Sequence, residues 1–204
     1  MYDKEFGRKS VKMAAKTTRV VYQFKVTLRD VQPPVWRRIQ LWEDSTLGQL
    51  HRILQIVMGW EDCHLHQFKI GQSVYSVPDP DDPFGSPGII NENRNKIQDA
   101  VQRVGTQFDY WYDFGDDWQH QLLLEAIMLP EPRVQYPRCL AGERSAPPED
   151  VGGPSGYADY LLQGSGRFDP EAFSLDDVNR QLHKAFRAAS STAAAPASPQ
   201  NRPN

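Results

Sequence analysis

One stretch of alternating aromatic residues constrains the fold of this chain more than any other feature. From Phe108 to Phe114, every second residue is aromatic, which places four rings on one face of an extended segment. A turn sequence, Gly115-Asp116-Asp117, follows at once, and apolar residues alternate again from Trp118 to Ala126. Alternation on both sides of a Gly/Asp turn predicts a β-hairpin over about 108–126.

Four further segments predict strands. Residues 20–28 alternate between large apolar and polar side chains, and residues 35–41 resume this pattern after Pro33-Pro34. A strand, a short proline turn and a strand suggest antiparallel neighbours. Residues 64–70 alternate as well, and Gly71-Gln72 is a plausible turn into an extended segment over 73–77.

The clearest helix is predicted over 46–58. Thr46 and Gln49 have the spacing of a capping box, apolar residues follow at helical spacing, and Gly59 provides a stop. Shorter helices are expected over 97–104 and 157–162, and a last one begins at Ser174 and carries an apolar stripe to Phe186. Residues 78–95 are expected to form a long loop, and residues 130–154 are rich in proline and predicted to be irregular.

Strands predominate and no regular βαβ alternation is present. The pattern therefore predicts an α+β fold: a single domain with a mainly antiparallel sheet of strands and hairpins and about three to four packed helices. The composition shifts at both ends of the 204-residue chain. We expect a basic, disordered arm over 1–19, a folded body over 20–187 and a disordered Ala/Ser/Pro tail over 188–204. Met13 is an alternative start.

Charge and cysteine content restrict the possible partners and the compartment. The formal net charge is −3, which argues against a dedicated DNA-binding domain, because such domains usually carry a strong basic face. No segment approaches the run of about 20 apolar residues that a membrane helix requires, so no membrane contact is expected. The two cysteines, Cys63 and Cys139, do not indicate a disulfide framework, and we expect reduced thiols and a cytoplasmic location.

Six blocks of residues are too particular for a generic globular domain: 33–38, 50–60, 64–68, 112–120, 137–142 and 147–157. In that order and spacing they resemble the plasmid pRiA4b ORF-three-like family. The resemblance covers about Tyr22 to Phe186. Members of this family are also labelled insertion-element passenger proteins of the TnpR type. The resemblance implies an α+β domain of plasmids and mobile elements, with no reaction attached to it, and nothing in the chain resembles the catalytic Ser and Arg set of a serine recombinase.

The chain departs from the pattern of this family at two positions. Members often carry cysteines where this sequence has Ala146 and Val151, so Cys139 stands alone here. Because a zinc ion held mainly by thiolates needs several such ligands, a cysteine-rich metal site is not predicted.

Three histidines are candidate ligands for a divalent metal. His64 and His66 are two residues apart, so on a strand both would point to one face, and His120 follows the Asp-rich turn on another strand. The alternative is that these rings form hydrogen bonds with loop carbonyls or with Asp113, Asp116 or Asp117. The spacing does not decide between the two readings.

Carboxylates and guanidinium groups complete the candidate residues. Asp113, Asp116 and Asp117 could serve acid–base chemistry or bind magnesium, but Asp and Gly are also what a tight hairpin turn requires. Arg37 and Arg38, beside Trp36, could bind phosphate or stack on a base. We favour ion pairs within the fold, because Arg37 lies on an otherwise apolar strand face, and its partners would be Glu149 and Asp150 or the acidic turn.

These residues lead to one main functional hypothesis and two alternatives. The first is a non-catalytic binding or accessory domain, associated with mobile DNA, that uses a cleft between the 113–120 hairpin and the 149–153 loop. The second is a metal-dependent hydrolase or nuclease that uses the three histidines and some of the carboxylates. The third is a nucleic-acid contact through Arg37, Arg38 and the basic arm; a protein partner is equally open. Phosphate-binding loops, nucleophile elbows and dinucleotide fingerprints are absent from the sequence.

Overall fold

The computed structural model describes residues 19–78, 88–164 and 166–192. Eight strands form one sheet in the order β5-β4-β3-β6-β7-β1-β2-β8. Neighbouring strands are antiparallel except for the β4–β5 pair, which is parallel. The strands are β1 (Val21–Leu28), β2 (Trp36–Trp42), β3 (His66–Ile70), β4 (Ser73–Ser76), β5 (Ile89–Asn91), β6 (Gln107–Tyr112), β7 (Trp118–Met128) and β8 (Arg138–Glu143).

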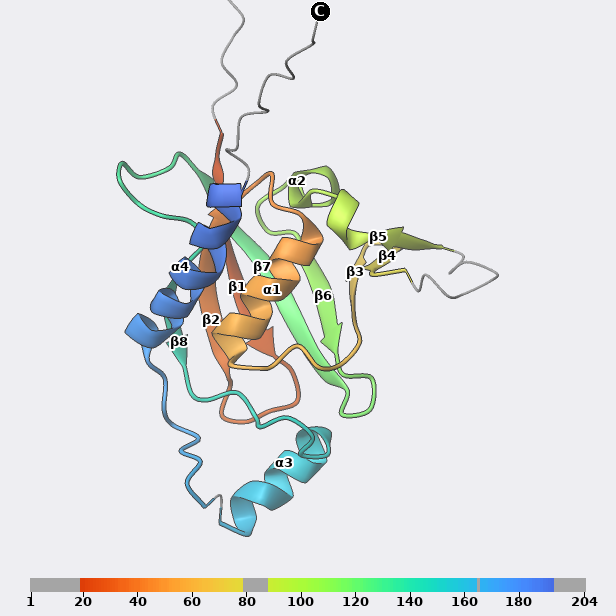
Figure 1. Cartoon of the computed structure of the whole chain (residues 1–204). Helices are drawn as coiled ribbons and strands as arrows, with labels where there is room; N and C mark the ends of the chain where they lie inside the picture. The colour runs from red at the N-terminus through yellow and green to blue at the C-terminus, as the bar shows by residue number, and fades with distance from the viewer. Residues whose placement is uncertain (1–18, 79–87, 165, 193–204) are drawn as a thin grey trace, which may run out of the picture.

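The helices lie on one face of the sheet and beyond one of its ends. Helices α1 (Leu47–Met58) and α4 (Leu175–Thr192) cross the same face, and α3 (Gly153–Leu162) lies past the lower end of the sheet in Figure 1. The short elements η1 (Glu92–Arg94) and α2 (Ile97–Ala100) connect β5 to β6. The predicted α+β fold with a mainly antiparallel sheet in one domain is confirmed.

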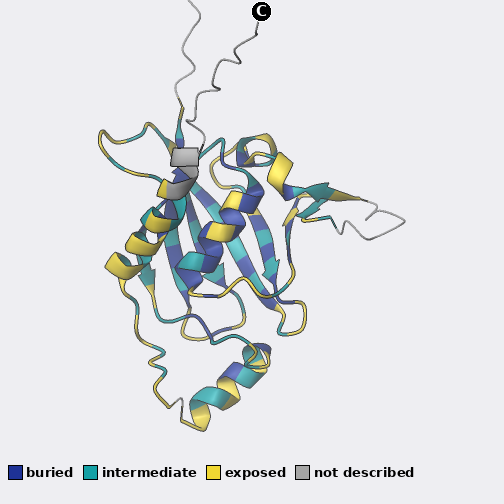
Figure 2. Ribbon diagram, in the orientation of Figure 1, coloured by how far each residue is buried: buried dark blue, intermediate teal, exposed yellow. Residues whose placement is uncertain are grey.

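Helix α1 begins and ends where local chemistry dictates. The Thr46 side chain accepts a hydrogen bond from the Gln49 backbone, and the Gln49 side chain accepts one from the Thr46 backbone, which completes the capping box. Gly59 adopts a left-handed conformation with φ of 82°, which terminates the helix. The inner side of the helix is buried against the sheet (Figure 2).

The core lies between α1 and the alternating apolar face of the central strands. Phe24, Phe68, Tyr110 and Leu122 are fully buried, and the polar side chains that alternate with apolar ones in these strands point to the other, more exposed face. The sheet is thus covered by helices on one face.

None of the helices in the described part of the chain combines the length and hydrophobicity needed to cross a bilayer.

Several boundaries differ from those expected. A strand, β8, forms in the segment predicted to be irregular and pairs with β2 at the edge of the sheet, with a bulge between Arg38 and Ile39. The described part of the expected 78–95 loop contains β5 and η1. Helix α4 continues to Thr192, past the limit expected at residue 187. The expectations for residues 1–18 and 193–204 lie outside the described residues.

Candidate functional site

Three segments that are distant in sequence meet at the lower end of the sheet in Figure 1. They are the residues before β3, the turn between β6 and β7, and the loop that precedes α3. The loop packs tightly onto the turn: the Gly152 N–H donates to Asp116 Oδ2 over 3.0 Å. A Cβ added to Gly153 would lie 2.3 Å from the Asp116 carbonyl oxygen, so only glycine allows this contact.

One imidazole faces three carboxylates at this junction. His64 Nε2 lies 3.1 Å from Asp150 Oδ1, 3.6 Å from Asp113 Oδ2 and 3.8 Å from Glu149 Oε2. We refer to His64, Asp113, Glu149 and Asp150 as the His64 cluster. Although these separations are short, His64 Nε2 and Glu149 Oε2 are buried atoms without a hydrogen-bond partner. The cluster therefore holds one imidazole nitrogen and one carboxylate oxygen that form no hydrogen bond within the described part of the chain.

The other oxygens of two carboxylates are held by protein donors. Asp113 Oδ1 accepts hydrogen bonds from the backbone N–H groups of Gly115 (2.9 Å) and Asp116 (3.3 Å). Glu149 Oε1 accepts from the Glu61 backbone N–H (2.9 Å) and from the Tyr112 hydroxyl (3.1 Å). Each carboxylate is thus oriented by one oxygen and presents the other to His64, as metal ligands with outer-shell support do.

The surroundings of the cluster keep Tyr112 neutral. Burial, with the carboxylate of Glu149 nearby, raises the pKa of the Tyr112 phenol above its usual range. The phenol is therefore a hydrogen-bond donor to Glu149 at neutral pH. Cys63 is also within reach: its sulfur and the ligand atoms of His64 and Glu149 all lie within 4.8 Å of one another.

Two acids of the cluster adopt an unusual backbone conformation. Asp113 and Asp150 both have φ of 54°, in the left-handed region that costs energy for residues with a side chain. Asp117 shares this conformation, with φ of 59°, yet its carboxylate accepts a hydrogen bond from the Gln119 side chain and does not face His64. Asp116 therefore holds the 149–153 loop and Asp117 stays at the rim, whereas Asp113 turns toward His64.

His66 does not join His64, contrary to the prediction. His64 precedes β3, so the two rings do not share a strand face. His66 is buried, lies 3.0 Å from Glu92 Oε2 and stacks on His51 with ring centroids 3.4 Å apart. The signal for this second group was a polar residue, His51, on the apolar side of the 46–58 helix.

His51 belongs to a buried hydrogen-bond chain. Its Nδ1 lies 2.8 Å from the Tyr110 hydroxyl, its Nε2 lies 2.7 Å from Asp62 Oδ1, and Gln55 donates to the same hydroxyl. Burial and the neighbouring His66 lower the pKa of His51. Since these polar atoms have hydrogen-bond partners within the protein, we interpret the group as a structural part of the fold.

His120 was expected near the rim and lies instead in the core. It is completely buried on β7, between Trp60 and Tyr110, and neither ring nitrogen has hydrogen-bond geometry to a partner. Burial lowers its pKa to about 3, although the backbone of Tyr110 and Trp118 partly opposes this effect. A ring enclosed in this way cannot share a ligand set with His64.

Arg37 and Arg38 point to opposite faces of the sheet and cannot act as a pair. Arg37 is buried, and its guanidinium donates to four backbone carbonyls, those of Trp36, Val57, Glu143 and Arg144, at 2.7–2.8 Å. The prediction of a carboxylate partner was wrong for Arg37, because backbone carbonyls of β2, of the end of α1 and of residues 143 and 144 fill that role. Burial lowers its pKa to about 10.

Arg38 has a carboxylate partner, but not one of those expected. It lies on the open face of the sheet and forms a bidentate ion pair with Glu125 at 2.7 and 2.9 Å. That carboxylate stands at the bulge of β7 opposite β1, a position that the sequence alone does not reveal.

The comparisons agree with the fold and with the sequence blocks. The family described as "Plasmid pRiA4b ORF-3-like protein" matches residues 20–190. The chain is 38% identical over 141 residues to the uncharacterized protein y4hQ of Sinorhizobium fredii, covering 69% of this chain and 71% of that protein. It is also similar to the crystal structure of MM3350, a protein of unknown function from Methanosarcina mazei Go1. That match has a TM-score of 0.71 and 34% identity, and covers 79% of this chain and 97% of the other. The chain therefore belongs to the plasmid pRiA4b ORF-3-like protein family.

Proposed function

We propose that this chain is a non-catalytic accessory domain that binds one divalent cation, Zn²⁺ or Mn²⁺, in the His64 cluster. The observation that carries the proposal is the convergence of three carboxylate oxygens within 3.8 Å of a buried imidazole nitrogen that lacks a hydrogen bond. Without a cation, the three carboxylates would repel one another with a single imidazole to offset them.

The spacing suits a small four-coordinate ion. Ligand atoms at about 2.1 Å from a tetrahedral zinc ion lie about 3.4 Å from one another. The three separations from His64 Nε2, from 3.1 to 3.8 Å, bracket that value. The ligand atoms of His64, Asp113 and Asp150 already lie within 4.8 Å of one another, whereas Glu149 forms a second such group with His64 and Cys63. Glu149 would therefore have to move toward Asp113 and Asp150 to complete a four-coordinate shell.

Four protein ligands favour binding over catalysis. Catalytic zinc sites keep one position open for water or substrate, whereas structural sites are closed by four protein ligands. Because the ligands come from three segments, the cation would fasten the 147–152 loop, and with it the start of α3, to the hairpin. Holding the loop and the hairpin together is what we mean by an accessory role. The plasmid named in the family description supports an association of the protein with mobile DNA.

The geometry lends less support to the nucleic-acid alternative. Of the two arginines on which it rests, Arg37 is buried and Arg38 is paired with Glu125. The basic arm over 1–18 lies outside the described residues.

The test measures metal content and metal-dependent stability of the full-length chain. Protein purified without chelator is analysed by mass spectrometry for bound metal, and its thermal unfolding is followed with and without added Zn²⁺ or Mn²⁺. We expect one metal ion per chain and, at a free metal concentration 100 times the Kd, a stabilisation of about 2.7 kcal/mol.

Two variants of the same turn provide the matched comparison. Asp113→Asn and Asp117→Asn each remove one charge at a position with positive φ, which asparagine tolerates. Asp113→Asn should weaken metal binding at least tenfold and Asp117→Asn should leave it unchanged, while His64→Gln should abolish it. The proposal is wrong if neither ion binds stoichiometrically, or if the two Asp variants weaken binding equally.

A further inference from the structure

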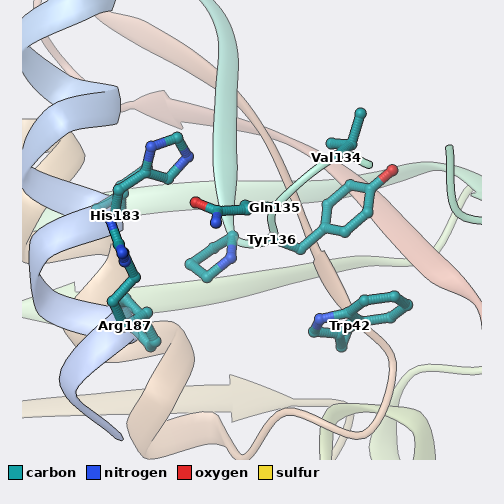
Figure 3. Close-up of a pocket in the computed structure, with 9 residues that line it drawn as sticks. Trp42, Val134, Gln135, Tyr136, His183 and Arg187 are labelled. Atoms are coloured by element: carbon teal, nitrogen blue, oxygen red, sulfur yellow. The ribbon is translucent and has the colours of Figure 1, made fainter. Parts of the chain in front are cut away.

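A second candidate site lies at the opposite end of the sheet from the His64 cluster. A cavity of about 500 Å³ lies between α4 and the segment that leads into β8, beside Trp42 at the end of β2 (Figure 3). Trp42 pairs with Val21 at the start of β1, whereas the turn between β6 and β7, which carries Asp113, lies at the opposite end of the sheet. Its volume falls within the range of about 300–1,000 Å³ that is typical of small-molecule sites.

Rigid aromatic rings form one wall of this cavity. Trp42 and Tyr136 meet edge to face, with ring centroids 4.9 Å apart and an interplanar angle of 68°. The Arg19 guanidinium lies 4.1 Å from the centre of the Trp42 ring, and the Tyr136 hydroxyl accepts a hydrogen bond from the Glu131 backbone over 3.1 Å. The rings are therefore held in place before any ligand arrives, which reduces the entropic cost of binding.

Helix α4 supplies the opposite wall. Two apolar side chains line the cavity from this helix: Leu182, which is fully buried behind it, and Phe186, which is half-buried. His183 and Arg187 lie one helical turn apart on the same side of the helix and also line the cavity, as Figure 3 shows. The wall thus combines apolar side chains with two nitrogen-bearing ones.

The charge of the cavity is one-sided. Among the described residues that line it, none is acidic. Within the described part of the chain, neither His183 nor Arg187 has a carboxylate within 4.0 Å, whereas Arg180 on the same helix pairs with Asp177. An exposed guanidinium without such a partner, at the edge of an open apolar hollow, is the complement of an anionic group attached to a flat apolar body.

We propose that this cavity binds a small aromatic anion, an aryl carboxylate or a molecule of similar size and charge. The ring lies against Trp42, Tyr136 and Phe186. The carboxylate is placed at the Arg187 guanidinium, which can hold both oxygens, and at the His183 ring. This site is independent of the cation that we propose for the His64 cluster.

The test uses two probes with the same ring system and similar size, one anionic and one neutral. Binding of 2-naphthoate and of the neutral 2-naphthalenemethanol to the full-length protein is measured by isothermal titration calorimetry. We expect saturable 1:1 binding of 2-naphthoate and at least tenfold weaker binding of the alcohol, because only the carboxylate can pair with Arg187.

Three variants locate the binding to this cavity. Arg187→Gln removes the proposed anion contact, Trp42→Leu removes the aromatic wall, and Lys184→Gln removes an exposed charge of the same helix that does not line the cavity. The first two should weaken naphthoate binding at least tenfold and the third less than twofold, with unchanged circular dichroism. The proposal is overturned if 2-naphthoate does not bind saturably, if the alcohol binds as well, or if Lys184→Gln and Arg187→Gln have equal effects.

Discussion

Replacing His120 by leucine should make the stability of this protein less sensitive to acid. The ring is completely buried and neither nitrogen has hydrogen-bond geometry to a partner among the described residues, so an apolar side chain of similar volume gives up only the contacts with the Tyr110 and Trp118 backbone. The pKa of His120 in the folded protein is about 3, against an ordinary value of 6.5. The folded state therefore holds this histidine neutral at pH values at which the unfolded chain protonates it.

The size of the effect follows from these two pKa values. As the pH falls below 6.5, the unfolded chain gains a proton that the folded chain does not, so the free energy of unfolding decreases, and the loss continues until the pH reaches about 3. Proton linkage with these values gives a loss of about 2 kcal/mol between pH 7 and pH 5. His120→Leu should remove that loss and leave the contributions of all other groups in place.

The measurement is urea unfolding at pH 7 and at pH 5, followed by circular dichroism. Wild-type protein should lose about 2 kcal/mol more than His120→Leu between the two pH values. Leu122→Val, a core change on the same strand that does not titrate, should cost about 1 kcal/mol at both pH values and leave the difference between them as in wild type. If His120→Leu shows the same difference as wild type, the ring is not held neutral by burial and the reasoning fails.

Two further predictions concern the contacts that hold the fold and the His64 cluster together. Arg37→Met leaves four carbonyls without their donor and should lower the free energy of unfolding in urea by about 3–5 kcal/mol. Arg38→Met removes a partly exposed ion pair and should lower the same free energy by less than about 1 kcal/mol. Equal losses in the two variants would contradict the assignment. Gly153→Ala should lower the melting temperature and the affinity for metal more than Gly152→Ala does. Both glycines have positive φ, but of the two added Cβ atoms only that of residue 153 would meet the Asp116 backbone. A larger effect at Gly152 would argue against this packing.

The elements that could be predicted from sequence are those whose determinants are local. The capping box at Thr46, the left-handed Gly59 and the alternation around the 115–117 turn all act within a few residues, and each one appears in the structure as expected. The same is true of the face of β2 that carries Arg37, because alternation along a strand fixes which side chains point inward.

The partners of the polar side chains depended on contacts between distant segments. The acids Glu149 and Asp150 follow His64 by more than 80 residues, and nothing in the sequence reveals that the loop carrying them closes onto the hairpin through Gly152 and Gly153. Strand β8 was missed because its residues show no alternation; its position comes from pairing with β2.

The three histidines show the same division most clearly. Their types and spacing are visible in the sequence, but the start of β3 after His64 separates it from His66, and the register of β6 and β7 places His120 inside the core. Local sequence thus determined the strands, the helix ends and the inward face of each element. Only tertiary packing decided which charged groups meet, because interactions between charged groups depend on distance in space and on burial, not on separation along the chain.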